Sequence, residues 1–235
     1  MSHAAAFVLT AILALLLAAL YSKWRNAARA EYIRQFTFPN GLFDKLRKKP
    51  PELSLKDCQL VALALRRVFL AYLKSRRRPV SMPSQVVDDL WHEFILYTKA
   101  YDAFCRRAFG RFMHHTPAAA LSNVHEHDVG LKRCWWHACR EESINPRKPT
   151  RLPLLFALDS KLNVADGFRY ALDCNQTQRR TADGKAVYCG GDFVSTSDGG
   201  TGCSSGGFSF DASGCSGGDG SGCSGGCGGG CGGGD

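Results

Sequence analysis

Residues 86–115 read VVDDLWHEFILYTKAYDAFCRRAFGRFMHH, and apolar side chains recur along this stretch at every third or fourth position. These positions are Val87, Leu90, Trp91, Phe94, Tyr101, Phe104, Cys105 and Ala108. Such spacing places them on one face of an α-helix. We expect this helix to begin near Pro83 or Ser84 and to end at Gly110, because glycine is favoured just beyond a helix C-terminus. The stretch therefore predicts a helix that contributes one face to the core of an all-α domain.

The same stretch carries polar side chains that suit a metal ion. On a helix, Asp88 lies four residues before His92 and Asp89 lies three residues before it, so either carboxylate can meet the imidazole. His114 or His115 could add a second imidazole, and an extended connector would turn only one of the two towards the site. Imidazole and carboxylate groups suit Zn or Fe. The alternative is that a carboxylate accepts a hydrogen bond from His92 and orients a packed ring.

Helices are also predicted on both sides of this stretch. Ser54 and Asp57 have the spacing of a helix N-cap with an acid three residues later. Residues 55–73 are apolar except for a narrow polar stripe, which predicts a helix that is buried on most of its surface. Another helix is expected over residues 131–142, and a short helical turn over residues 154–159. The sequence thus predicts a compact multi-helix domain with residues 55–73 at its centre.

The N-terminal segment has the composition of a transmembrane helix. Residues 4–21 are apolar except for Thr10. A helix of this length is about 27 Å long, close to the hydrocarbon thickness of a bilayer. Trp24 then suits the membrane interface, and basic residues stand at positions 23, 25, 29 and 34. This bias predicts a single-pass membrane protein with its N-terminus outside and its helical domain in the cytoplasm.

Positive charge is concentrated in the body of the chain. All 30 lysine and arginine residues lie at or before Lys185, and five of the 21 acidic residues follow it, so residues 1–185 carry a net charge of +14. The basic runs KLRKK at 45–49 and KSRRR at 74–78 could lie on the membrane face and attract anionic lipid headgroups. We predict no specific binding of nucleic acid, because the sequence has no zinc-finger, RNA-recognition or aromatic-interleaved basic motif.

The C-terminal composition predicts a disordered tail over residues 191–235. Of the last 46 residues, 20 are glycine and nine are serine, which leaves too little apolar surface to offset the chain entropy. The tail thiols that could bind a soft metal ion are Cys215, Cys223, Cys227 and Cys231. The alternative is that they belong to low-complexity sequence produced by repeat expansion.

Cys174 and Cys189 bound a polar loop that we expect to be hairpin-like. They could form a disulfide in an oxidising compartment, or could be half of a zinc site or two free thiols.

Together these features divide the chain into a transmembrane anchor at 1–24, a helical domain at 25–170, a cysteine-bounded loop at 171–190 and the Gly/Ser/Cys-rich tail at 191–235.

The central stretch resembles the signature of the glycine-rich domain-containing protein-like family. The matching positions are Asp88 or Asp89, Trp91, His92, Ile95, Leu96, Thr98, Tyr101, Cys105, Gly110 and His114 or His115. Many members have a second histidine two positions after the first, where this chain has Phe94, which removes one possible metal ligand. The resemblance covers residues 36–165, and the Gly/Cys-rich tail is similar to that of bacterial members. It implies a helical domain and supplies no particular activity.

Three functions are compatible with these patterns. We expect a membrane-tethered interaction or scaffold module without enzymatic activity, which binds an unidentified protein. In this hypothesis the central helix is part of the hydrophobic core. The second hypothesis is a metal-binding protein or metalloenzyme that uses Asp88, His92 and His114 or His115, with Zn or Fe as its cofactor. The third is a binder of anionic lipid or nucleic acid through the basic runs, which strong salt sensitivity of binding would reveal.

Overall fold

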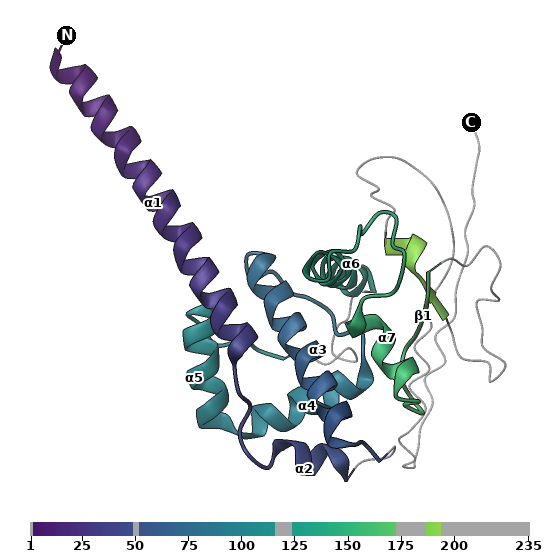
Figure 1. Ribbon diagram of the computed structural model, residues 1–235. Helices are drawn as coiled ribbons and strands as arrows, with labels where there is room; N and C mark the ends of the chain where they lie inside the picture. Colours follow the sequence, from purple (N-terminus) through teal and green to yellow (C-terminus); the bar gives the residue numbers. More distant parts are fainter. Residues whose placement is uncertain (1, 49–51, 116–123, 173–186, 194–235) are drawn as a thin grey trace, which may run out of the picture. The chain divides into compact units, whose positions relative to one another are not determined.

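The computed structural model describes residues 2–48, 52–115, 124–172 and 187–193. Helices dominate these residues and confirm the expectation of a mainly helical protein (Figure 1). The helices are α1 (Ser2–Gln35), α2 (Leu42–Arg47), α3 (Leu55–Lys74), α4 (Gln85–Leu96), α5 (Thr98–Phe109), α6 (Val124–Glu141) and α7 (Leu154–Lys161).

Helix α3 lies at the centre of the helical domain, as predicted. Its N-terminus is closed by the expected capping box, in which Ser54 and Asp57 each accept a hydrogen bond from the backbone N–H of the other. Most of its side chains are buried, among them Leu65 and Phe69. It contacts α1, α2, α4, α6 and α7, which explains why only a narrow polar stripe remains on its surface.

The prediction of one continuous helix through the central stretch is wrong, because the chain bends at Tyr97. This residue separates α4 from α5 and has φ −80° and ψ 60°, outside the helical region. The bend lets Phe94 of α4 and Phe104 of α5 pack on one another and on Phe36, with ring centroids 4.5–5.6 Å apart. Gly110 ends α5 with φ +77°, as predicted from its position.

A small sheet follows the helices, so the all-α prediction is correct only for the larger part of the domain. Strand β1 (Arg169–Ala171) pairs in parallel with β2 (Val187–Cys189), and the short helix η2 (Gly190–Phe193) follows. A hairpin would join antiparallel strands, so the hairpin expectation is wrong for the strands that flank this loop. Cys189 is disulfide-bonded, whereas Cys174 and the expected turn lie outside the described residues.

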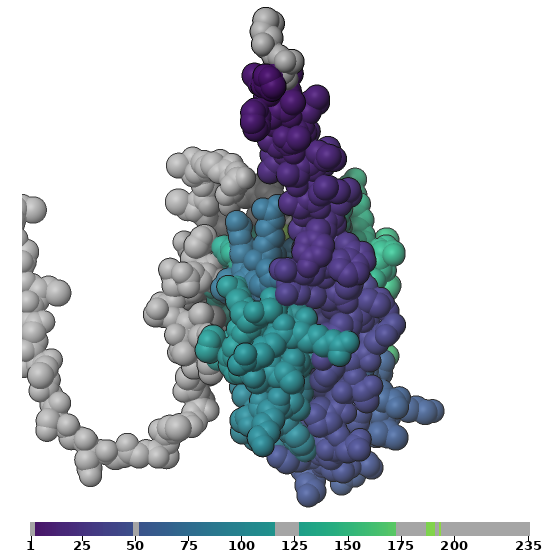
Figure 2. Space-filling view, turned by 90° about the vertical axis from the view of Figure 1, so that its left-hand side faces the viewer, coloured from purple at the N-terminus to yellow at the C-terminus, as the bar shows by residue number. Residues whose placement is uncertain are grey.

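Within the described part of the chain, α1 is the one helix long and apolar enough to span a bilayer. Its large apolar side chains between Phe7 and Trp24 are exposed, from 49% for Ile12 to 75% for Phe7, whereas Ala30 and Ile33 are buried. The C-terminal part of α1 contacts α3 and α5. Figure 2 shows this part beside the teal surface of α5, with the N-terminal part standing clear of the other helices. One helix therefore provides both a candidate membrane span and a part of the domain core.

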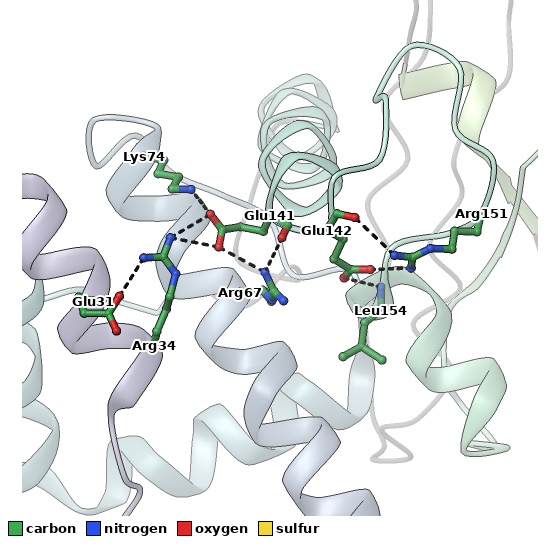
Figure 3. A network of polar contacts seen from close by, with 8 residues as sticks. All are labelled: Glu31, Arg34, Arg67, Lys74, Glu141, Glu142, Arg151 and Leu154. Carbon is green, nitrogen blue, oxygen red and sulfur yellow. Dashed lines mark hydrogen bonds and ion pairs between the residues drawn. The ribbon is translucent and has the colours of Figure 1, made fainter.

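A largely buried carboxylate fastens α1 to α3 and α6 (Figure 3). The Glu141 side chain, at the end of α6, is 8% exposed and accepts hydrogen bonds from Arg34 of α1 at 3.3 Å. It also accepts from Arg67 and Lys74 of α3. Arg67 donates in addition to the Glu141 carbonyl oxygen at 3.1 Å. Because cations from two helices converge on one carboxylate of a third, the C-terminal end of α1 has a fixed position against the domain.

The Gly/Ser/Cys-rich tail cannot be compared with its prediction in the same way. Residues 194–235 lie outside the described residues, and with them lie the candidate thiols Cys215, Cys223, Cys227 and Cys231.

Candidate metal centre

The N-terminus of α4 is held by a buried aspartate that the sequence did not indicate. Asp159 of α7 is 1% exposed, and one of its carboxylate oxygens accepts a hydrogen bond from Ser84 Oγ at 2.6 Å. The other oxygen accepts from the backbone N–H groups of Gln85 and Phe168, both at 2.8 Å. A carboxylate at this position also complements the positive end of the helix dipole. No local pattern could reveal the contact, because Asp159 and Ser84 are 75 residues apart.

This anchored helix presents Asp88 and His92 on one surface, as the spacing predicted. Asp88 Oδ2 lies 3.6 Å from His92 Nδ1. The side chain of Asp88 is 20% exposed and that of His92 is 45% exposed, so the pair is accessible from solvent. Asp89, the alternative carboxylate, is not in the group of possible metal ligands found within the described ranges.

Tyr101 of α5 fixes the segment that carries His115. Its hydroxyl accepts a hydrogen bond from the Trp91 indole at 3.1 Å and donates one to the Met113 carbonyl at 2.7 Å. Burial raises the pKa of Tyr101 far above its ordinary value, so the hydroxyl keeps the proton that it donates. The Trp91 ring also packs edge-on against His115, with centroids 4.3 Å apart. These contacts bring the segment after α5 back to α4.

Of the two adjacent histidines, His115 joins Asp88 and His92. His115 Nε2 lies 3.4 Å from Asp88 Oδ1, and its ring centroid lies 4.5 Å from that of His92. His114 packs instead against Phe112, with centroids 5.0 Å apart. This outcome is the one expected of an extended connector, in which neighbouring side chains point to opposite sides.

The three side chains lie close enough together to share one cation. One donor atom from each of Asp88, His92 and His115 lies within 4.8 Å of the other two. Around a tetrahedral zinc ion with bonds of about 2.0–2.1 Å, two donor atoms are about 3.3 Å apart. The contacts of the carboxylate are near this value, at 3.4 Å from Oδ1 to His115 Nε2 and 3.6 Å from Oδ2 to His92 Nδ1, and they run to two different oxygens. They are longer than ordinary hydrogen bonds of about 2.7–3.2 Å. The spacing is thus compatible with a shared cation, and equally with a carboxylate that orients two imidazole rings.

His115 is in the protonation state that a metal ligand needs. Burial, with a smaller effect of nearby His92, lowers the pKa of His115 to about 4. The imidazole is therefore neutral near pH 7, which is the form that binds metal ions. Within the described residues, its buried Nε2 atom makes no hydrogen bond, which leaves that nitrogen available for a cation.

The cluster opens onto a cleft of about 970 Å³, which Asp88 and His115 line. The cationic and imidazole side chains elsewhere in the lining are Arg77, Arg111, Arg133, His114 and His127. Among the described lining residues Asp88 is the only acid, so the cleft suits an anionic group that can reach the cluster. The sequence could not indicate this cleft, because its basic residues come from three separate segments of the chain.

These features define a helical protein with one candidate membrane span and an Asp-His-His cluster beside a basic cleft. The chain belongs to the UCP032817-like family, whose profile matches residues 28–193. The resemblance to the glycine-rich domain-containing protein-like family is therefore wrong, because no comparison indicates that family. No curated protein and no solved structure matches the chain. The matched range contains all three members of the cluster, so the candidate centre lies in the part that defines the family.

Proposed function

We propose that this protein is a membrane-anchored metal-binding protein, in which Asp88, His92 and His115 hold one zinc or iron ion. The observation that carries the proposal is the convergence of three donor atoms within 4.8 Å, from α4 and from the segment after α5. Two imidazoles and one carboxylate form a donor set that suits both zinc and non-haem iron(II). Three protein ligands leave coordination positions open, and the adjoining cleft gives access to them. When bound, the ion would supply Lewis acidity at the end of a basic cleft.

Elemental analysis of the full chain, purified in detergent, tests this proposal. We expect about one zinc or iron ion per wild-type chain, because three protein ligands are sufficient for a stable site. The ion should be lost in His115→Ala. His114→Ala is the matched control, since the same change in the adjacent residue leaves the cluster intact and should retain the ion. A folded wild-type chain that takes up neither metal, or an equal loss in both variants, would contradict the proposal.

An interaction module without metal stays the competing prediction. In that case the aromatic side chains of α4 and α5 are purely core, and Asp88 orients two imidazole rings. This alternative predicts a folded, metal-free protein whose partner can be captured from membranes. The same elemental analysis therefore separates the two functions.

We also propose that α1 spans the membrane once, with the N-terminus outside and the helical domain in the cytoplasm. The basic residues at positions 23, 25, 29 and 34 support this orientation. The disulfide at Cys189 supports the opposite one, because disulfides persist in oxidising compartments. Reporter fusions at both ends decide between them: a C-terminal reporter that is active only outside the cytoplasm would overturn our orientation.

A further inference from the structure

Two arginine side chains are fastened to the lining of the cleft beside the candidate metal centre. Arg111, in the segment after α5, donates through Nη2 to the Arg77 carbonyl at 2.8 Å and to the Tyr72 hydroxyl at 3.1 Å. Arg133 of α6 donates through Nη1 to the carbonyl oxygen of Pro79. The two accepting carbonyls belong to residues two positions apart, which corresponds to at most about 7 Å of chain. Hydrogen bonds thus bring two guanidinium groups to one short segment of the cleft lining.

The acceptors of both guanidinium groups are neutral, so these hydrogen bonds leave the positive charges uncompensated. Within the described part of the chain, neither Arg111 nor Arg133 forms an ion pair with a carboxylate, and Arg77, which lines the same cleft, forms none either. The only acid among the described lining residues is Asp88, which lies within 3.6 Å of two imidazole nitrogens. A cleft with three uncompensated cations attracts an anion.

The two guanidinium groups have further N–H groups that a ligand can reach. Arg111 is an exposed residue, and its hydrogen bonds to other described residues use only Nη2. Arg133 is half-buried and uses only Nη1, and none of its nitrogens is among the buried atoms that lack a partner. The Nε atom of Arg77 is buried, by contrast. Arg111 and Arg133 are therefore the residues that can contact an anion directly, whereas Arg77 adds to the positive charge.

The close approach of α6 to the cleft requires a glycine. A Cβ atom at Gly130 would overlap Ser81, whose backbone nitrogen would be only 2.9 Å away. The Ser81 hydroxyl also donates to the His127 carbonyl at 2.8 Å. These contacts hold the N-terminal half of α6 against the segment before α4, and Arg133 follows Gly130 by about one helical turn. The position of Arg133 is thus determined by the packing of α6.

The rest of the cleft extends from these arginines to the Asp-His-His cluster. Its lining follows the chain from Pro79 to Asp88, so the arginines and the cluster lie towards opposite ends of this stretch. The apolar side chains of the lining are Val80, Met82, Trp91, Phe112, Met113 and Phe168. The volume of about 970 Å³ is within the range of small-molecule sites. A matching ligand has an anionic group at one end and an apolar body that extends towards the cluster.

We propose that the cleft binds a phosphate monoester, with its phosphate group on Arg111 and Arg133 and its organic part on the apolar lining. A monoester has three terminal oxygens and a charge of about −1.5 to −2 near pH 7. It matches several uncompensated cations better than a carboxylate, which has a single charge. Guanidinium groups bind phosphate oxygens through paired N–H donors. Any action of the metal ion on this ligand rests on the proposed metal centre, whereas binding to the arginines does not need the ion.

Calorimetric titration of the full chain in detergent tests the proposal, with phenyl phosphate as the probe. Benzoate, which keeps the ring with a single charge, and inorganic phosphate, which has no ring, are titrated separately. We expect phenyl phosphate to bind at least about tenfold more tightly than either, because each of the other two lacks charged hydrogen bonds or apolar contacts. The titrations use the chelator-treated chain, so a chain that takes up no metal still tests the phosphate site, and the two proposals fail separately.

Two variants and a matched control assign the binding to the arginines. Arg111→Gln and Arg133→Gln should each weaken the binding of phenyl phosphate by about tenfold or more. Arg140→Gln is the control, because Arg140 is an exposed residue of the same helix as Arg133 and does not line the cleft. It should bind like the wild type, and the Tm of each variant without ligand shows whether it is folded.

Four results would count against the proposal. A wild type that does not bind phenyl phosphate would overturn the site. Unchanged binding in the two folded variants, or an equal loss in Arg140→Gln, would overturn the role of Arg111 and Arg133. Equal binding of benzoate would overturn the phosphate assignment, and equal binding of inorganic phosphate would overturn the role of the apolar lining.

Discussion

The hydroxyl of Tyr101 helps to set the geometry of the candidate centre, together with the three candidate ligands. Tyr101 connects the Trp91 indole of α4 to the Met113 carbonyl, two residues before His115. Sequence alone narrowed the second imidazole to His114 or His115, because alternation in an extended segment allows one of them. It could not choose between them, since the choice depends on a hydrogen bond to a residue in another element.

Tyr101→Phe should weaken metal binding while the aromatic packing is retained. We expect the affinity for zinc to fall about tenfold, since the segment that places His115 loses its fixed position. The free energy of unfolding should fall by about 1–2 kcal/mol, because the Trp91 N–H and the Met113 carbonyl lose a partner. Titration against a chelator and denaturant unfolding measure the two effects. Tyr97→Phe is the control, since the Tyr97 hydroxyl has only a 3.5 Å exposed contact, and equal effects of the two changes would contradict this role.

The buried imidazole of His115 should make the stability of the metal-free protein depend on pH. Its pKa is about 4 in the folded protein, and an unfolded histidine has a pKa of about 6.5. As the pH falls below about 6.5, the unfolded chain binds the proton first, so stability is full above this value and decreases towards pH 4. The loss should approach about 3 kcal/mol. Unfolding of the chelator-treated chain against pH measures it, and a His115→Gln variant with the same slope would contradict the assignment.

For the helices, patterns of neighbouring residues predicted where a helix begins or ends. The bend between α4 and α5 depends instead on contacts between residues far apart in the sequence. The capping box at Ser54 and the left-handed Gly110 depend on neighbours within a few residues, so a single sequence reveals them. The bend at Tyr97 depends on how Phe94 and Phe104 pack against Phe36, which precedes them by more than fifty residues. The apolar spacing continues across Tyr97, so it predicted one helix and did not indicate the bend.

Asp159→Asn should destabilise α4 at its N-terminus. In the wild type, both carboxylate oxygens of Asp159 accept hydrogen bonds. Asparagine would replace one of these oxygens with an NH2 group, which cannot accept. It would also remove the negative charge that complements the helix dipole. We expect a loss of about 2–4 kcal/mol in the free energy of unfolding. Asp102→Asn is the control, because its exposed pair with Arg106 contributes less than about 1 kcal/mol. Denaturant unfolding compares the two, and similar losses would contradict the role of Asp159.

For the whole molecule, the composition of the N-terminal segment predicted the apolar span, because hydropathy is summed over consecutive residues. It could not predict how α1 joins the domain, since the contacts of Glu141 link residues that are 67 to 107 positions apart. The sequence also showed no sign of the cleft beside the Asp-His-His cluster. Its basic residues come from the turn after α3, the segment after α5 and α6, which only the fold brings together.

Glu141→Gln should loosen the attachment of α1. The change leaves Arg34, Arg67 and Lys74 without the carboxylate on which they converge. We expect the free energy of unfolding to fall by about 2–3 kcal/mol. This is less than the full effect of breaking a buried ion pair, because two of the partners are partly exposed. Protection of the amides of residues 28–35 against hydrogen exchange should fall as well. Glu31→Gln, at a 54% exposed side chain, is the control. Unchanged protection in Glu141→Gln would show that packing alone holds the helix.

The continuity of α1 has a mechanical consequence. The helix runs from Ser2 to Gln35 without a break, and its last turn is clamped, so no flexible tether separates the apolar segment from the domain. The whole helix is about 50 Å long, and the part that projects from the domain acts as a rigid stalk. If α1 spans a bilayer as proposed, any tilt that it takes up in bilayers of different thickness must swing the cleft through the same angle. The height and direction in which the cleft faces its surroundings are then set by the lipid, and a ligand that moves in the membrane plane would approach it by a two-dimensional search.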